Sequence, residues 1–445
     1  MKERPDDHTS EERKFVEASV WRRRLKRGGI AAAAAAFAGV VAFGSSFLHS
    51  ELRIEQQVHE ANEQLKTGHA DVGLLLAYDA FRREKSQRTR EILQVTAQSG
   101  PPLLEADQTI VDAALSADGG TMAAATSVGV VVWSRFGKTS QVAPWSLSQI
   151  PMPATLSYRS PPLAVAVGQD GTRVAAGSQN GDVMIWNSGA AAPGAPFSAG
   201  SAIASLAFAT DGHLAITTGN KEIIFWKDGV IEKRGITPGV ASTSAVSPDS
   251  STVAVGMLDD GWVHFWRPKS GSWIDGLKHD EPVVSFVAYT IDGKLIGSAS
   301  KGGKIYRWSP GDASHVSKIG GQNQIFVSSA MDAAGVNMAG YTSDHSLIVF
   351  DAQGKTKLNL PEQVPAQAKV IPNSEGALQG KVLLDSKGAF VALGAADGIR
   401  VYELTDDALA ARARVKLRDY GLSLSDCQQV LKSAAICRAD LEASR

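Results

Sequence analysis

The sequence predicts an all-β, seven-bladed β-propeller with an N-terminal transmembrane helix, juxtamembrane helices and a short C-terminal helical tail. Three observations predict it: seven β-rich repeats of about forty residues, one uninterrupted apolar run, and abundant glycine with few aromatics. The 445 residues include 43 glycines, and 7% are aromatic. Frequent tight turns and few large core side chains favour a β structure that is built by repetition.

Charge and cysteine content exclude several classes of protein. Lys and Arg number 45 and Asp and Glu number 46, so the net charge is −1. A dedicated nucleic-acid binder would show a basic excess, and we therefore expect no nucleic-acid partner. The two cysteines, Cys427 and Cys437, are too few for a disulfide framework or a four-thiolate zinc site.

An apolar segment at residues 30–48 follows a polar and basic segment at residues 1–29. Only Ser45 and Ser46 are polar in this run. A helix of that length spans roughly 28 Å, close to the thickness of the hydrocarbon core of a bilayer. We expect a transmembrane helix. A buried helix of a soluble protein lacks support because no polar stripe exists, and a cleaved signal peptide lacks support because no Ala-x-Ala site closes the run.

The charge on either side of this segment predicts its orientation. Residues 10–29 hold seven Lys or Arg, whereas residues 49–68 hold only Arg53 and Lys66. Because basic flanks remain cytoplasmic, we expect a single-pass protein with a cytoplasmic N-terminus and an extracytoplasmic propeller.

Residues 49–99 are expected to form juxtamembrane helices. The stretch from Glu51 to Lys66 contains good helix formers and neither Pro nor Gly. Apolar residues at helical spacing continue between Ala70 and Gln98, interrupted by a charged stretch at Arg82–Arg90. This pattern predicts two or three short helices that end before Gly100-Pro101-Pro102.

Residues 103–404 contain seven copies of one unit. Each copy has an extended apolar run, an Asp-Gly type of turn, a run of small residues, a second turn, and a β run that ends in an aromatic residue. The first turns are Asp118-Gly119-Gly120, Asp170-Gly171, Asp211-Gly212, Pro248-Asp249-Ser250, Asp292-Gly293, Asp332–Gly335 and Ser386-Lys387-Gly388. The closing aromatics are Trp133, Trp186, Trp226, Trp266, Trp308, Phe350 and Tyr402.

Seven such sheets bury both faces only when they stack radially, which predicts a propeller. The seventh unit, Gly376–Leu404, supplies three strands. We therefore expect its outer strand to come from Leu103–Ala106, ahead of the first blade, because this overlap removes an open sheet edge.

The unit resembles the WD repeat, a family of β-propellers. The run SPDSSTVAVGMLDDGWVHFW (Ser247–Trp266) is similar to the family's stretch from the Ser-Pro-Asp-Gly turn to the closing Trp. The family's Gly-His pair is missing, and its turn Asp is present only as Asp260 and Asp344, with Asn180 and Asn220 replacing it elsewhere. The resemblance therefore implies that the family's buried His–Asp network is absent from most blades.

The tail, residues 405–445, is expected to contain two helices that pack on the propeller rim or on the preceding helices. Asp406 to Leu417 has helical apolar spacing, and Ser425-x-x-Gln428 is a capping-box pattern that opens a second helix through Ile436. Cys427 and Cys437 would lie near opposite ends of that helix, which predicts free or packed thiols.

The layout as a whole resembles the C-terminal half of bacterial STAND-type signalling ATPases that carry WD repeats. Three segments carry the resemblance, in the same order: Ser10–Arg27, Gly73–Thr96 and Ala411–Leu431. No Gly-x-x-x-x-Gly-Lys-[Ser/Thr] phosphate-binding loop is present. The resemblance implies a sensor or docking half without its ATPase.

No residue pattern for catalysis, cofactor binding or metal binding occurs. The nine histidines are scattered singly, without metal spacing, and Gly-x-Ser-x-Gly is absent. His264, between two tryptophans in a strand, reads as a packed or rim side chain. Asp259-Asp260 reads as a hairpin turn, and His279-Asp280-Glu281 as solvated surface.

The leading hypothesis is a membrane-anchored, non-enzymatic module that binds a protein partner and needs no cofactor. Its candidate contact residues lie on or beside loops, where Trp and Arg favour interfaces: Trp145, Trp262, Trp273, Arg159, Arg234 and Arg267. The alternative for each is packing within its own blade.

The second hypothesis is an enzyme or small-molecule binder that uses the central channel. It requires polar residues that converge from equivalent positions of several blades. The runs taken as the inner ones, such as Met122–Ala125 and Val174–Gly177, are small and apolar, which favours the first hypothesis.

Overall fold

The computed structural model describes residues 52–97, 103–105, 110–126, 129–135, 145–150, 162–187, 194, 196–320, 324–361, 381–395, 398–421, 424–431 and 437. The predicted transmembrane helix at residues 30–48 and the polar segment at residues 1–29 lie outside these ranges. Within these ranges, no helix combines the length and the apolar character that crossing a bilayer requires.

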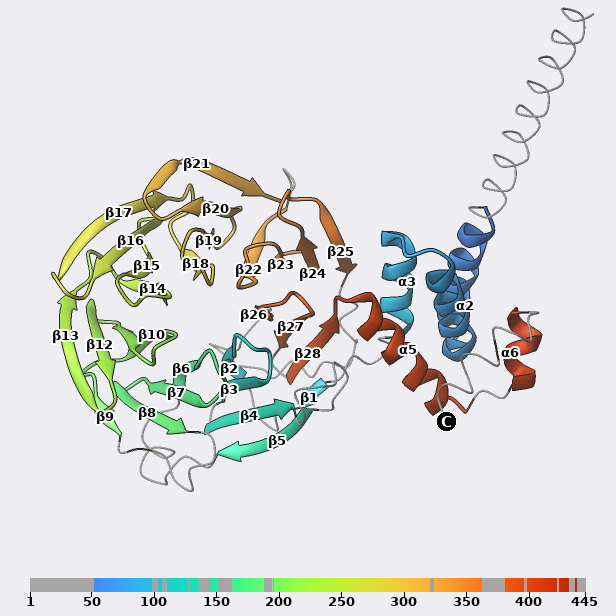
Figure 1. The fold of residues 1–445 in the computed structure, drawn as a ribbon, viewed down its shortest axis with the longest axis horizontal. Coiled ribbons are helices and arrows are strands. Elements are labelled where there is room, and N and C mark those ends of the chain that lie inside the picture. The colour runs from blue at the N-terminus through green and yellow to red at the C-terminus, as the bar shows by residue number, and fades with distance from the viewer. Residues whose placement is uncertain are drawn as a thin grey trace, which may run out of the picture.

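Seven four-stranded antiparallel sheets, the blades, are arranged around a central axis (Figure 1). Blades 1 to 3 contain β2 (Ile110–Leu115), β3 (Thr121–Thr126), β4 (Gly129–Arg135) and β5 (Trp145–Ile150); β6 (Pro162–Val167), β7 (Arg173–Ser178), β8 (Asp182–Asn187) and β9 (Phe197–Ser198); and β10 (Ile203–Phe208), β11 (Leu214–Thr218), β12 (Glu222–Lys227) and β13 (Val230–Ile236).

Blades 4 to 6 repeat this pattern, and the fold class predicted for the β region is confirmed. They contain β14 (Ala241–Val246), β15 (Val253–Met257), β16 (Trp262–Arg267) and β17 (Ser272–Lys278); β18 (Val284–Tyr289), β19 (Ile296–Ser300), β20 (Ile305–Ser309) and β21 (Asp312–Ile319); and β22 (Phe326–Met331), β23 (Met338–Thr342), β24 (Ser346–Phe350) and β25 (Thr356–Pro361). In blades 1 to 6 the predicted closing aromatic lies on the third strand in chain order, and in blade 7 it lies on the last strand of the propeller.

Blade 7 is built from both ends of the propeller. Its three inner strands are β26 (Lys381–Leu384), β27 (Phe390–Ala395) and β28 (Gly398–Glu403), and its outer strand is β1 (Leu103–Glu105). β1 is antiparallel to β28, with Leu104 opposite Ile399. The predicted closure of the ring by residues ahead of blade 1 is thus confirmed.

Small residues in the second strand of a blade allow the next blade to approach closely. A Cβ atom added at Gly177 would lie 2.5 Å from the side chain of Ile203, and one at Gly256 would lie 2.6 Å from Val284. Ile203 and Val284 are the first residues of the neighbouring inner strands β10 and β18. The runs of small residues therefore pack between blades, where the strands converge toward the axis.

A helical unit flanks the ring beside β25, β28 and β1 (Figure 1). It combines the helical residues 52–66, α2 (Ala70–Arg83) and α3 (Gln87–Ala97) with α5 (Asp406–Asp419) and α6 (Leu424–Leu431). Its core joins Leu74 and Phe81 of α2 to Leu409 and Leu417 of α5. The tail helices therefore pack on the helices that precede the propeller, and α5 buries the face predicted from its spacing.

Polar contacts fasten this unit across its two halves. Arg90 of α3 forms an ion pair with Asp406 of α5 at 2.6 Å, and Lys416 Nζ donates to the Ala97 carbonyl at 3.1 Å. Gln94 of α3 donates to the carbonyl of Glu403, the last residue of β28. The segments before and after the propeller are thus held together close to the strand pair that closes the ring.

The expectation of free thiols in the tail is wrong, because Cys427 and Cys437 form a disulfide with their Cα atoms 5.8 Å apart. The expectation assumed one continuous helix from Ser425 to Ile436. The described helix α6 begins one residue earlier and ends at Leu431, between the two cysteines. Both cysteines are buried in the helical core.

Candidate functional site

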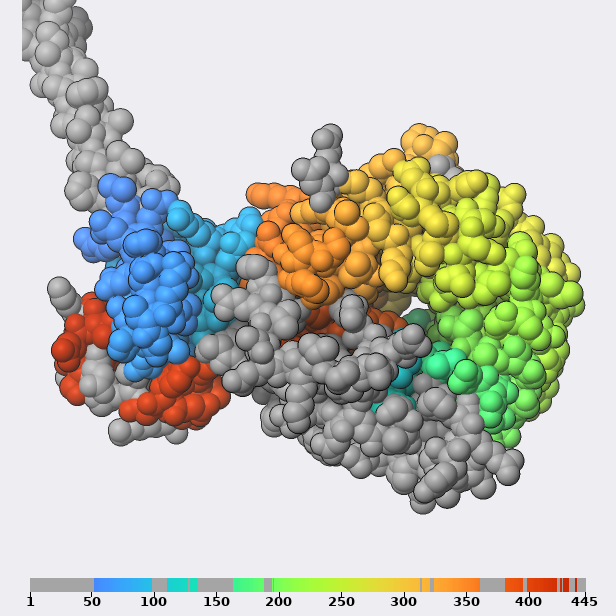
Figure 2. Space-filling model, turned by 180° about the vertical axis from the view of Figure 1, so that it is seen from behind, coloured from blue at the N-terminus to red at the C-terminus, as the bar shows by residue number. Residues whose placement is uncertain are grey.

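The first strands of all seven blades line a central channel of about 620 Å³. Figure 2 shows the opening of this channel in the middle of the ring. The lining changes along the axis. At the next-to-last residue of each first strand, the equivalent position is Ala in six blades and Leu in the seventh: Ala114, Ala166, Ala207, Ala245, Ala288, Ala330 and Leu383.

Two residues earlier along each first strand, the equivalent positions are more polar. They are Asp112, Ala164, Ser205, Thr243, Phe286, Ser328 and Lys381. Together with Ser244 and Ser329, which follow Thr243 and Ser328, their polar members form what we call the polar belt. The expectation of an apolar channel is therefore wrong.

The reason lies in which strand faces the axis. Met122–Ala125 and Val174–Gly177 belong to the second strands, β3 and β7, whereas β2 and β6 line the channel. Asp112 and Lys381, which the sequence analysis missed, are separated by 269 residues and meet only because the ring closes. Their equivalent strand positions in blades 1 and 7 could have revealed them.

Asp112 and Lys381 form an ion pair between blades 7 and 1. The other carboxylate oxygen of Asp112 accepts from the backbone N–H of Val165 in blade 2, at 2.9 Å. Ser328 of blade 6 accepts from the backbone N–H of Val382 in blade 7, at 3.0 Å. The belt therefore connects neighbouring blades as well as lining the channel.

Two of the predicted contact residues meet on the rim of blade 4. The Trp262 ring stacks on His264 with centroids 5.5 Å apart, and His264 meets Trp273 edge-on at 6.4 Å. Lys278 Nζ lies 5.8 Å from the Trp262 ring centroid, and Asp275 lies 2.9 Å from the His264 Nδ1 atom. We call Trp262, His264 and Trp273 the rim cluster.

The rim cluster combines packing with exposure. Both tryptophans are partly buried against the core between blades 3 and 4, which contains Phe225 and Trp266. The rest of each tryptophan side chain is exposed at the outer side of blade 4. His264, expected to be packed or at the rim, is buried and supports both rings.

The remaining predicted contact residues do not join this cluster. Arg234 of β13 lies 3.7 Å from Glu222 across the same blade, and Arg267 is exposed at the end of β16. Trp145 is the first residue of β5, and Arg159 lies outside the described residues.

His279 is buried, contrary to the expectation of solvated surface for His279-Asp280-Glu281. Its Nε2 atom lies 3.0 Å from the Ser298 hydroxyl, which also accepts from the Trp308 indole N–H at 2.9 Å. Sequence reasoning missed the connection because these residues come from a loop and two strands of blade 5. Asp280 and Glu281 are exposed, as expected.

The buried hydrogen bonds that join His279, Ser298 and Trp308 are not repeated in blades 2 and 4. The indole N–H groups of Trp186 and Trp266 have no partner among the described residues, because Ala176 and Val255 replace the serine. Packing therefore replaces the hydrogen bonds in these two blades.

The aspartates of the first turns accept hydrogen bonds that hold these turns in place. The Asp249 carboxylate accepts from the Ser247 hydroxyl and the Ser251 backbone N–H, and these bonds lower the pKa of Asp249. Asp211 accepts from His213 and from Ser250 of the next blade, and these bonds hold its pKa at about 2 despite partial burial.

Among the described residues, no group of three metal-ligating side chains forms a metal site.

Burial lowers the pKa of His279 from 6.5 to about 4, only partly opposed by the nearby Asp280 charge. Between pH 6.5 and about 4, His279 binds a proton in the unfolded chain but not in the folded chain. Its contribution to the free energy of unfolding is therefore fully present above pH 6.5 and is lost as the pH falls toward 4. The loss reaches roughly 3 kcal/mol. His279→Gln, which does not titrate, is expected to show a flatter pH dependence in urea unfolding between pH 6.5 and 4, and equal slopes would contradict the assignment.

Comparison with known proteins gives one family match, in blade 2. Residues 154–187 match the family described as WD domain, G-beta repeat, and the described part of this segment contains β6, β7 and β8. No curated protein matches the chain. The matched repeat and the ring of seven four-stranded blades together support a WD-repeat propeller.

Proposed function

We propose that this protein is a membrane-anchored, non-enzymatic scaffold or sensor that binds a protein partner through its propeller. WD-repeat propellers generally bind protein partners, and the chain carries one matched repeat on a seven-bladed ring. The observation that carries the proposal is the rim cluster, in which two partly exposed tryptophans are held by a buried histidine.

The rim cluster has the properties of an interaction hot spot. Tryptophan buries a large area at low entropic cost, and hot spots combine a packed base with an exposed edge. The Trp262 and Trp273 rings are already ordered by His264, so a partner would not need to immobilise them. Lys278, whose Nζ atom lies 5.8 Å from the Trp262 ring centroid, adds an exposed cation beside them.

The anchor is the apolar segment at residues 30–48, and the orientation follows from the basic residues that precede it. The disulfide between Cys427 and Cys437 supports an extracytoplasmic propeller, because disulfides persist in oxidising compartments. The sensor role rests on the resemblance to the C-terminal half of STAND-type ATPases. In this role the helical unit, which follows the anchor directly and contacts blade 7, transmits binding to the membrane.

Replacement of the two rim tryptophans is expected to remove the partner. A stoichiometric protein recovered with the wild-type chain from solubilised membranes should be lost with Trp262→Ala plus Trp273→Ala, because the apolar anchors of the interface are gone. Tyr420→Ala, at an exposed aromatic of the helical unit, is the matched control and should retain the partner. Retention by the double variant, or turnover of a substrate by the purified ring, would contradict the proposal.

The membrane orientation predicts protection from added protease. In intact spheroplasts the propeller should be cleaved from outside, while a tag at the N-terminus should be cleaved only after permeabilisation. Thiol labelling of the protein denatured directly from these cells should find Cys427 and Cys437 unreactive until a reductant is added. Cleavage of the propeller only in permeabilised cells would place it in the cytoplasm and contradict the orientation.

A further inference from the structure

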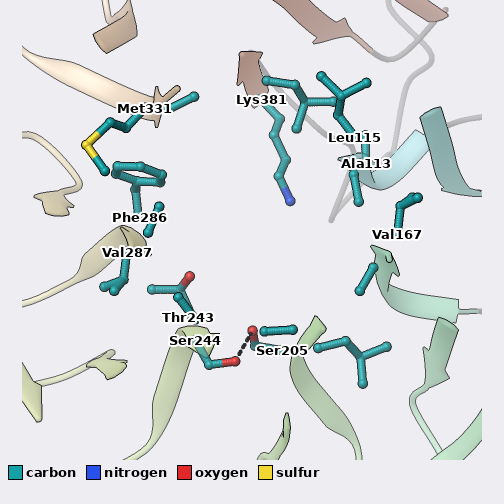
Figure 3. A pocket seen from close by; sticks show the side chains of 18 of the residues that line it. Ala113, Leu115, Val167, Ser205, Thr243, Ser244, Phe286, Val287, Met331 and Lys381 are labelled. Atoms are coloured by element: carbon teal, nitrogen blue, oxygen red, sulfur yellow. Dashed lines mark hydrogen bonds between the residues drawn. The ribbon is translucent and has the colours of Figure 1, made fainter. Parts of the chain in front are cut away.

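The central channel has an arrangement of charge and polarity that the partner-binding role does not use. In Figure 3 the Lys381 side chain extends into the channel from one wall, and Ser205, Thr243 and Ser244 lie on the opposite wall. Phe286, Val287 and Met331 occupy the side between them. The cross-section therefore has a charged pole, an apolar middle and a hydroxyl pole.

The charged pole carries both signs within one ion pair. The Lys381 ammonium donates one N–H to Asp112, and its other two N–H groups have no hydrogen-bond partner among the described residues. Asp112 accepts one bond at each oxygen, from Lys381 and from the Val165 N–H, and each oxygen retains a second acceptor site. A ligand can therefore bind both charges without breaking the pair.

The hydroxyl pole also has hydrogen-bonding capacity to spare. Ser205 and Ser244 bond to one another at 2.9 Å, so their pair retains one free donor. The Thr243 hydroxyl has no hydrogen bond to another described residue and points into the channel (Figure 3). The half-buried Thr243 hydroxyl is therefore available to a polar group of an occupant.

We propose that the channel binds a zwitterionic amino acid with an apolar body and a hydrogen-bonding tip. The adjacent opposite charges of Lys381 and Asp112 complement the α-carboxylate and α-ammonium groups of one molecule. Phe286 and Met331 contact its apolar body, and Thr243 binds its tip. The net charge of the pole is zero, which disfavours a simple anion or cation because either would face one like charge at close range. This inference is independent of the rim cluster.

The channel is large enough for such a ligand, since small-molecule sites occupy about 300–1,000 Å³. L-tyrosine is the probe with all three features. L-phenylalanine lacks the tip, N-acetyl-L-tyrosine lacks the ammonium, and L-tyrosinamide lacks the carboxylate. Isothermal titration of the full-length protein in detergent with these four probes separates the contributions of the two poles.

L-tyrosine is expected to bind more tightly than each of the other three probes. Thr243→Val, which keeps the side-chain shape, should weaken L-tyrosine by about 2- to 10-fold and leave L-phenylalanine unchanged, because one hydrogen bond is lost. Thr172→Val, in an exposed turn outside the channel, is the matched control and should bind like the wild type. Asp112→Asn with Lys381→Met removes both charges together, so neither is left unpaired, and should abolish binding.

Several results would overturn the proposal. Equal affinity for L-tyrosine and for either singly charged probe would show that the two charges do not act together. Unchanged L-tyrosine affinity in Thr243→Val would exclude the hydroxyl pole. Absence of heat from every probe at millimolar concentration, with the protein folded by circular dichroism, would leave Asp112 and Lys381 as a purely structural link between blades 7 and 1.

Discussion

The pairing of β1 with β28 is the contact on which the rest of the structure depends. Each blade buries its faces only against two neighbours, so an open ring would expose two sheet faces at once. The three residues of β1 join a segment ahead of blade 1 to the last strand of the propeller. Because this pairing crosses the whole propeller sequence, it also brings Asp112 to Lys381 and places the preceding helices beside the following ones.

The helical unit gives this closure a second layer. α3 from before the ring and α5 from after it share one apolar core, and the Arg90–Asp406 ion pair links them. The Gln94 side chain ties α3 to the Glu403 carbonyl at the end of β28. Opening the ring would therefore also require separation of buried helices. Such coupling supports the proposed sensor role, because movement of blade 7 would displace the helices that contact it.

Local patterns in the sequence were sufficient to predict much of this fold. The Asp-Gly turns and closing aromatics fix three strands of every blade, and the deficit of one strand in blade 7 predicts its replacement by Leu103–Ala106. Contacts between distant residues were not predictable in the same way. The disulfide depends on where α6 ends, and the burial of His279 depends on Ser298 and Trp308 reaching it from two strands.

The candidate sites show the same contrast between features that local sequence predicts and contacts that only the fold creates. The rim tryptophans were found because residue type alone suggests an interface, and the structure explains their meeting through the pairing of β16 with β17. The polarity of the channel was predicted wrongly because the runs of small residues were taken as its lining. These runs lie on the second strand of each blade, one strand away from the axis. Five of its polar residues, in blades 1, 3, 4, 6 and 7, occupy one equivalent position, which is visible only after the register of the first strands is known.

Cross-linking of β1 to β28 tests ring closure most directly. Leu104→Cys with Ile399→Cys, in a chain with Cys427→Ser and Cys437→Ser, places two thiols directly opposite one another in an antiparallel pair, within reach of a disulfide. The account predicts nearly complete oxidation, so that a chain cut once within the ring still migrates as one covalent molecule. Two separate fragments, with both thiols free in the folded protein, would contradict it.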